Sequence, residues 1–185
     1  MNKVVFLLVC AYCFTAPVFA DTEPTPQELE QKIVEYTVLL NQDGNNARYL
    51  NALGFAYYKL HRMDEAMDSF IKAISIDPEY AVTYNNLGVA YLSLKEYKKA
   101  EASFTTALKL DPHYVKAAYN LAVTLFRQKK YFEAYKGYRY AKNIDSAYVK
   151  KRLNESNARE KLNDEIRKDP DNEQLRELRK GIDEK

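Results

Sequence analysis

The sequence predicts an all-α fold in which helical hairpins stack into a solenoid, and three observations lead to this expectation. Several residue types recur every 34 positions through the middle of the chain. Within each copy, apolar residues fall three or four positions apart, which is the spacing of one face of an α-helix. The 185 residues include only 5 Gly, too few for the many turns of a β-sandwich. A helical repeat array accounts for all three observations.

The first 20 residues have the pattern of an export signal. Lys3 precedes an unbroken apolar stretch at residues 4–14, and the small residue Ala20 ends the segment. This is the order of a secretory signal: a charged start, an apolar core and a small-residue cleavage site. The apolar stretch is shorter than the ~20 residues that span a bilayer. We expect cleavage after Ala20 and a periplasmic location, the alternatives being secretion or a membrane anchor through an uncleaved or lipidated N-terminus.

Composition and motifs argue against several function classes. Both cysteines, Cys10 and Cys13, lie inside the predicted signal, so we expect neither a disulfide scaffold nor redox chemistry in the mature chain. The formal net charge of +2 gives no electrostatic footprint for nucleic acid. His61 and His113 are not at metal-ligand spacing, and no nucleophile or phosphate-loop motif is present. We therefore expect a non-enzyme without catalytic residues, metal, cofactor, nucleic acid or small-molecule substrate.

The period of 34 defines repeats at residues 47–80, 81–114 and 115–148. Each repeat carries two apolar stripes at helical spacing, separated by a short polar turn, and is therefore expected to form two helices. A proline closes the first two repeats, and proline disfavours helix in the residue before it. The recurring positions are Leu53, Leu87 and Leu121; Gly54, Gly88 and Ala122; Ala66, Ala100 and Ala134; Phe70, Phe104 and Tyr138; and Tyr80, Tyr114 and Tyr148.

These positions follow the tetratricopeptide repeat signature, W-x2-L-G-x2-Y, then A-x3-F, then P. Residues 47–80 and 81–114 resemble it closely, whereas 115–148 is a degenerate copy. The resemblance implies a right-handed α-α solenoid of three tetratricopeptide repeats with flanking helices. It also implies that the first helix of each repeat lines a concave groove that holds a peptide or helix of a partner protein.

The flanking segments are expected to cap the array. Residues 21–46 resemble a half repeat, because Tyr36 falls 34 positions before Phe70 and a capping-box pattern starts at Thr25. Residues 149–185 are rich in charge and are expected to form polar capping helices. The alternative for residues 172–185 is a helix that docks on a partner or on a neighbouring copy.

The groove-lining stripe of the first helices contains the candidate binding residues. They are Arg48, Asn51, Phe55, Tyr58, Asn85, Asn86, Val89, Lys116, Tyr119, Asn120, Val123 and Arg127. Asn86 and Asn120 resemble the asparagine ladder of some family members, in which amides pair with the backbone of an extended peptide. The alternative is that asparagine simply suits a solvated helix. The first repeat has Ala52 at that place, so a ladder would have two rungs.

A second family pattern, the carboxylate clamp of chaperone adaptors, is matched only in part. Lys116 and Asn86 occupy two of its places, but Phe55 and Asn120 stand where an asparagine and an arginine are needed. The basic residues still predict a mildly positive groove that favours acidic segments. We therefore expect a non-catalytic scaffold or adaptor of the cell envelope that binds a partner protein. The alternative is a self-associating structural component, with homo-oligomers, of an envelope or secretion assembly.

Overall fold

A computed structural model describes residues 24–152, 163–173, 175, 176 and 179. The predicted signal peptide at residues 1–20 lies outside the described residues and stays a prediction. The helices in chain order are α2 (Pro26–Gln42), α3 (Ala47–Lys59), α4 (Met63–Ile76), α5 (Ala81–Ser93), α6 (Tyr97–Leu110), α7 (Val115–Arg127), α8 (Tyr131–Ile144) and α9 (Ser146–Arg152).

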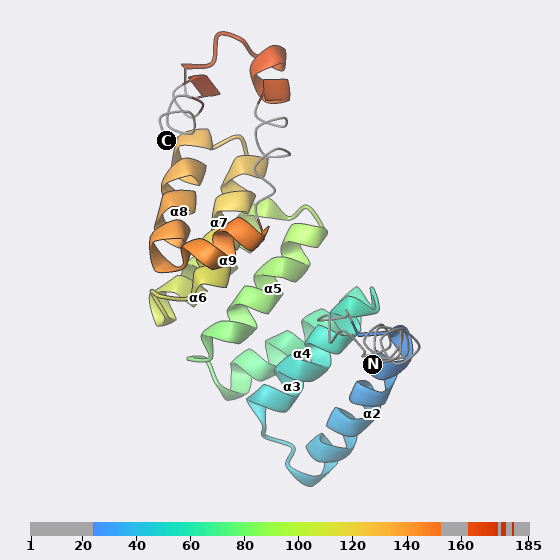
Figure 1. The fold of residues 1–185 in the computed structure, drawn as a ribbon. Helices are drawn as coiled ribbons and strands as arrows, with labels where there is room; N and C mark the ends of the chain where they lie inside the picture. The colour runs from blue at the N-terminus through green and yellow to red at the C-terminus, as the bar shows by residue number, and fades with distance from the viewer. Residues whose placement is uncertain (1–23, 153–162, 174, 177–178, 180–185) are drawn as a thin grey trace, which may run out of the picture.

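The helices pack as consecutive antiparallel pairs, α3 with α4, α5 with α6 and α7 with α8. The pairs stack in chain order from α2 at one end to α8 and α9 at the other (Figure 1). The described residues are helices and connecting turns, with no strand among them. The fold class predicted from the sequence, an α-α solenoid of helical hairpins, is therefore confirmed. Within the described residues, no helix is both long and apolar enough to cross a membrane.

Each hairpin closes around a small residue and a large ring. Gly88 on α5 lies against the ring of Phe104 on α6, and Phe104 is completely buried. Gly54 and Phe70 make the same contact in the preceding hairpin. In these two hairpins the glycine lets the aromatic ring fill the space between the paired helices, so the core is close-packed.

The third hairpin also has small residues where its two helices meet. Ala122 takes the place of the glycine on α7, and Gly137 lies opposite it on α8. A Cβ added at Gly137 would lie 3.2 Å from the Cβ of Ala122. The degenerate sequence of this repeat thus keeps the close approach of its two helices.

The turn inside each hairpin depends on one residue in the left-handed backbone region. His61, Lys95 and Lys129 have φ angles of 61°, 61° and 63°. In each turn the next amide reaches back to the last turn of the first helix; the Glu96 N–H, for example, donates to the Tyr91 carbonyl at 2.9 Å. These bonds satisfy carbonyls that a helix end leaves unpaired.

The two flanks cover the ends of the array. α2 begins in a capping box, in which Thr25 and Glu28 each accept from the other's backbone amide, and packs Leu29 and Ile33 against α3. At the other end Leu175, which is 1% exposed, packs on Tyr131 of α8. The described residues on both flanks therefore cover apolar surface that the outer hairpins would otherwise expose.

Candidate functional site

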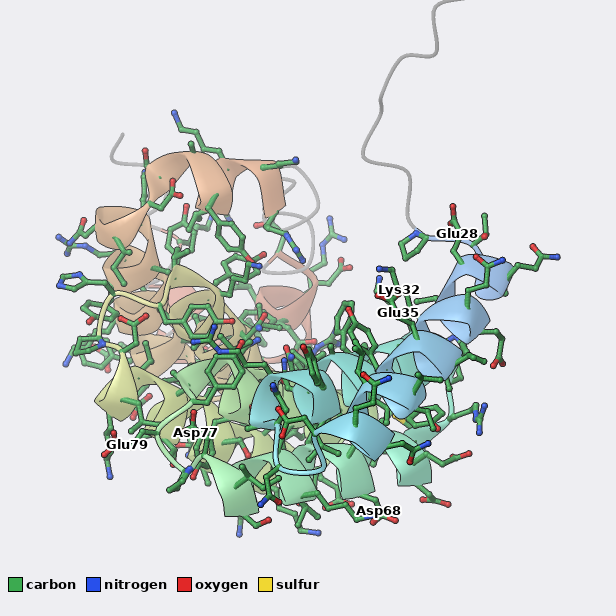
Figure 2. The ribbon with its side chains drawn as sticks, turned by 90° about the horizontal axis from the view of Figure 1, so that it is seen from below. Glu28, Lys32, Glu35, Asp68, Asp77 and Glu79 are labelled. Atoms are coloured by element: carbon green, nitrogen blue, oxygen red, sulfur yellow. The ribbon has the colours of Figure 1, made fainter. Side chains whose placement is uncertain are left out.

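The first helices of the three hairpins form one continuous surface. α3 contacts α5 and α5 contacts α7, so the three helices lie side by side. Seen from below, the ribbon follows an arc open on one side, with α2 on one arm and α9 on the other (Figure 2). We call the side of α3, α5 and α7 that carries the twelve predicted binding residues the A-face. Arg48, Phe55, Lys116 and Arg127 are exposed there, Asn51 and Asn85 are buried, and Tyr58, Asn86, Val89, Tyr119, Asn120 and Val123 are half-buried.

Four asparagines on the A-face are joined in a single chain of side-chain hydrogen bonds. The Asn120 amide nitrogen donates to Asn85 Oδ1 at 3.0 Å, across α7 and α5. Asn85 donates to Asn86 Oδ1 at 3.3 Å, and Asn86 donates to Asn51 Oδ1 at 2.9 Å, across α5 and α3. We call these four residues the amide chain. The sequence carried a signal for it, because each bond between helices joins asparagines 35 residues apart.

The amide chain separates the predicted asparagines into two kinds. Asn51 and Asn85 are only 7% and 4% exposed, so their amides serve contacts between helices. Asn86 and Asn120 are half-buried and each donates one bond within the protein. A primary amide has two N–H groups, so each retains a second donor that is not used by the chain. The ladder residues are thus held in place by their neighbours and still face outwards.

Aromatic and basic side chains from the first two repeats form the N-terminal part of the A-face. The rings of Phe55 and Tyr58 lie 6.5 Å apart on α3, and the Tyr58 hydroxyl is hydrogen-bonded to Ser93 Oγ of α5 at 2.9 Å. The guanidinium of Arg48 lies over the ring of Tyr80 at 5.8 Å. These contacts hold Tyr58 and Arg48 in defined positions.

The tyrosines at the last position of each repeat approach one another in space, which sequence reasoning did not identify as part of the site. Burial, together with the nearby hydroxyls of Tyr80 and Tyr148, raises the pKa of Tyr114 to about 12. Tyr148 also meets Tyr119 edge to face at 6.2 Å, and the guanidinium of Arg152 lies over its ring at 5.4 Å. The period of 34 gave the spacing of these tyrosines but not the side of the helices on which they meet.

The charge of the A-face has one sign along its three helices. α3, α5 and α7 contain no aspartate or glutamate. Their charged residues are Arg48, Lys59, Lys116 and Arg127. The acidic residues of the repeats lie instead on the second helices and in the turns, as Asp68, Asp77 and Glu79 do in Figure 2. A surface with this charge favours a ligand that is neutral or acidic.

The sequence matches known repeats over most of this array. Residues 47–80 and 81–114 each match a family model described as the tetratricopeptide repeat, and residues 103–136 match a second model with the same description. The chain belongs to the tetratricopeptide repeat family. Proteins of this family are in general interaction modules that are not catalytic. No curated protein matches the chain.

Solved structures share this tetratricopeptide fold. A crystal structure of MamA superposes with a TM-score of 0.61 at 24% identity, covering 67% of this chain and 72% of that one. The first repeat domain of Spaghetti (RPAP3), bound to the HSP90 peptide SRMEEVD, gives 0.54 at 27% identity, with 75% and 91% covered. The Arabidopsis OM64 domain gives 0.53 at 21% identity, covering 75% and 94%.

The described part of this tetratricopeptide protein offers no evident metal-binding group. Among the described residues, no three His, Cys, Asp or Glu side chains lie close enough to hold an ion. His61 lies in the turn between α3 and α4, and His113 in the turn between α6 and α7. The polar groups of the A-face are amides, phenols, guanidinium and ammonium groups.

Proposed function

We propose that this tetratricopeptide protein is a non-catalytic scaffold of the cell envelope that binds an extended peptide or a helix of a partner protein on its A-face. The amide chain is the observation that carries this proposal. It holds Asn86 and Asn120 half-exposed on neighbouring helices, each with an unused N–H. Amides spaced in this way can pair with a peptide backbone whatever its side chains. The candidate contact residues are the A-face residues named above, among which the buried Asn51 and Asn85 act by holding Asn86 and Asn120 in place.

Two further observations support the proposal. The Spaghetti (RPAP3) domain, which has this fold and covers 75% of the chain, is bound to a peptide. The location rests on the sequence of residues 1–20, which have the order of an export signal. Sequencing the N-terminus of protein recovered from the native host would test the location. A mature chain that begins at Asp21 is expected, and a cytoplasmic chain that retains Met1 would contradict it.

Replacing the two ladder residues tests the binding site. The double variant Asn86→Ala and Asn120→Ala is compared with wild-type protein in a pull-down from an envelope extract of the native host. We expect the double variant to lose the partners that wild-type protein retains, because it lacks both half-exposed amides. An unchanged set of partners would overturn the proposed site.

The control has to separate binding from folding. Asn143→Ala removes an exposed amide from α8, on the other helix of the third hairpin, and should retain every partner. Circular dichroism of all variants should show the same helix content. If the double variant loses helix content, the pull-down is repeated with Asn120→Ala alone, which leaves the bond between Asn86 and Asn51 in place.

One observation favours self-association as a second function. Residues 21–80 carry 11 acidic and 5 basic side chains, a formal net charge of −6, whereas residues 81–152 carry 5 acidic and 14 basic side chains, a net of +9. Opposite halves of two copies therefore attract each other at low salt. Light scattering of the mature chain tests this function: a mass that rises at low ionic strength and falls at high ionic strength is expected, and a strict monomer at low ionic strength would exclude it.

A further inference from the structure

Basic side chains are most numerous at the C-terminal end of the array, on α7 and α9. α7 and α9 carry five basic and no acidic side chains, which are Lys116, Arg127, Lys150, Lys151 and Arg152. All five are exposed. By contrast α5, in the centre, has no charged residue. The charge along the array is therefore unequal, and the strongest attraction for an anionic group lies over α7 and α9.

Two tyrosines stand among these basic residues. Tyr119 of α7 and Tyr148 of α9 meet edge to face at 6.2 Å, and Arg152 lies over the Tyr148 ring at 5.4 Å. Lys116 precedes Tyr119 by three residues, so the two share one side of α7. We call Lys116, Tyr119, Tyr148 and Arg152 the anchor patch. The anchor patch combines residues up to 36 positions apart in the sequence, because α9 packs on α8 of the third hairpin.

The two phenols are suited to hydrogen bonding with carboxylates. Burial raises the pKa of Tyr119, and it raises the pKa of Tyr148 despite the opposing charge of Arg152. Both hydroxyls therefore keep their protons throughout the physiological range and can donate. A carboxylate accepts from such hydroxyls and from charged nitrogens, and the charge-assisted bonds are the stronger of the two kinds.

The opposite end of the array has the opposite charge. α2 carries Glu28, Glu30 and Glu35 against the single basic Lys32. Figure 2 shows Glu28, Lys32 and Glu35 along α2 on its arm of the arc. An acidic ligand is therefore attracted less at α2 than at α7 and α9.

Building on the proposed function, we propose that the bound segment is charge-polarised and lies in one direction, with its acidic end on the anchor patch and a neutral or basic end towards α2. The recognised groups are Asp and Glu side chains. They need not include a terminal carboxylate, because Phe55 and Asn120 replace two residues that a terminal-carboxylate clamp requires. The occupant is thus an internal stretch of a partner protein with clustered acidic residues.

Peptide binding measured by fluorescence anisotropy tests the polarity. The probes are two peptides of about ten residues. The segment would run over α2, α3, α5 and α7, and four helices about 9 Å apart cover about 30 Å. An extended chain covers about 3.3 Å per residue, so about ten residues are needed. Both have blocked ends and identical composition; one has its glutamates clustered at one end and the other has them evenly spread. We expect the clustered peptide to bind about fivefold more tightly at low salt.

A matched pair of arginine variants locates the contact. Arg152→Gln removes a guanidinium that lies over Tyr148, and Arg139→Gln removes one that lies over Tyr135 on α8 at 5.9 Å. We expect Arg152→Gln to weaken the binding of the clustered peptide about fivefold and Arg139→Gln to leave this affinity unchanged. A photo-crosslinker on the acidic end should label α7 or α9, and one on the other end should label α2 or α3.

Each result decides between the two proposals. Suppose that the two peptides bind equally, and that binding is lost in the double variant Asn86→Ala and Asn120→Ala but kept in Arg152→Gln. This result would support the proposed function and overturn the proposed polarity of the bound segment. Binding of neither peptide would overturn both. A single-stranded oligonucleotide that competes as well as the clustered peptide, with the same sensitivity to Arg152→Gln, would show a general polyanion surface and overturn the proposal of an acidic protein segment.

Discussion

The ring of Phe104 lies directly on Gly88, so that a Cβ at residue 88 would come within 2.7 Å of Phe104 Cε1. Real Cβ contacts are not that short, and Phe104 is completely buried. The contact explains why a residue that weakens helices stands in the middle of α5.

Gly88→Ala is therefore expected to destabilise the protein by about 1–2 kcal/mol, since overpacking outweighs the gain in helix propensity. Urea unfolding followed by circular dichroism measures the change. Gly44→Ala is the control, because the nearest atom to its added Cβ is a backbone oxygen at an ordinary 3.6 Å. A Gly88→Ala variant as stable as wild-type protein would mean that the ring and the helix separate without cost.

Glycine at a hairpin turn should have the opposite effect. Lys95 is exposed and has a φ angle of 61°, a conformation that costs a residue with a side chain about 1–2 kcal/mol. Glycine adopts this conformation without strain, but it also makes the unfolded chain more flexible, which offsets part of the gain. We therefore expect Lys95→Gly to stabilise the protein by about 0.5–1 kcal/mol. The matched control is Lys98→Gly, in the first turn of α6, which should destabilise. A lower melting temperature for Lys95→Gly would contradict the expectation.

A buried hydroxyl offers a third test. Thr83 is fully buried on α5, and its Oγ1 has no hydrogen-bond partner among the described residues. Thr83→Val keeps the shape and removes the unpaired polar atom, so we expect a gain of about 1 kcal/mol. Thermal unfolding measures it. Thr83→Ser, which keeps the hydroxyl and loses a methyl group, should instead destabilise, and a loss of stability in both variants would indicate that the hydroxyl is satisfied.

The amide chain should contribute to stability through its buried members. Asn85→Ala removes the acceptor of the Asn120 amide and the donor to Asn86 Oδ1, although Asn86 keeps its bond to Asn51. We expect a loss of about 1 kcal/mol, because the half-buried amide of Asn120 loses its acceptor. Chemical denaturation measures the loss, and Asn143→Ala on the exposed side of α8 should change stability by less than about 0.5 kcal/mol. Equal effects of the two variants would contradict a structural role for the chain.

The ion pair between α6 and the turn before α8 predicts a pH dependence. Partial burial raises the pKa of Glu101, but the hydrogen bonds from Lys130 at 2.9 Å and Gln128 at 2.7 Å outweigh it, so the pKa lies below its ordinary value. A carboxylate with a lowered pKa stabilises the fold above its unfolded pKa, about 4.3, and this stabilisation disappears as the pH falls through the folded pKa.

The difference between wild-type protein and Glu101→Gln should therefore be about 0.2–1 kcal/mol at pH 7 and smaller at pH 3. Urea unfolding at the two pH values measures it. Glu133→Gln, which removes an exposed carboxylate from α8, serves as the control and should show a smaller difference at pH 7. A pH-independent effect of Glu101→Gln would exclude the ion pair as its cause.

The repeat period made the fold predictable, whereas the site was predictable only in part. A period of 34 with glycine and phenylalanine at fixed places can be satisfied only by stacked hairpins, so Gly88 and Phe104 led to the architecture. The same period placed the tyrosines in sequence but could not show that Tyr148 turns towards Tyr119. That contact depends on the angle at which α9 leaves α8, which no repeat position encodes.

The asparagines illustrate the same limit. Helical spacing predicted Asn51, Asn85, Asn86 and Asn120 on one side of their helices, and the structure joins their side chains by hydrogen bonds. Whether an amide faces a ligand or a neighbouring helix depends on small differences in helix rotation. Asn51 and Asn85 face neighbouring helices, and this was visible only once the distances between side chains were known.

The amide chain also has a direction, because both of its bonds between helices donate from the later helix to the earlier one. A slide of α5 by one residue along α3 would break the bond between Asn86 and Asn51 and leave a buried oxygen unpaired. The first helices are thus locked in register by polar groups, whereas apolar contacts alone tolerate small slips. The two bonds between helices thus help to fix the spacing that α3, α5 and α7 offer to a bound segment.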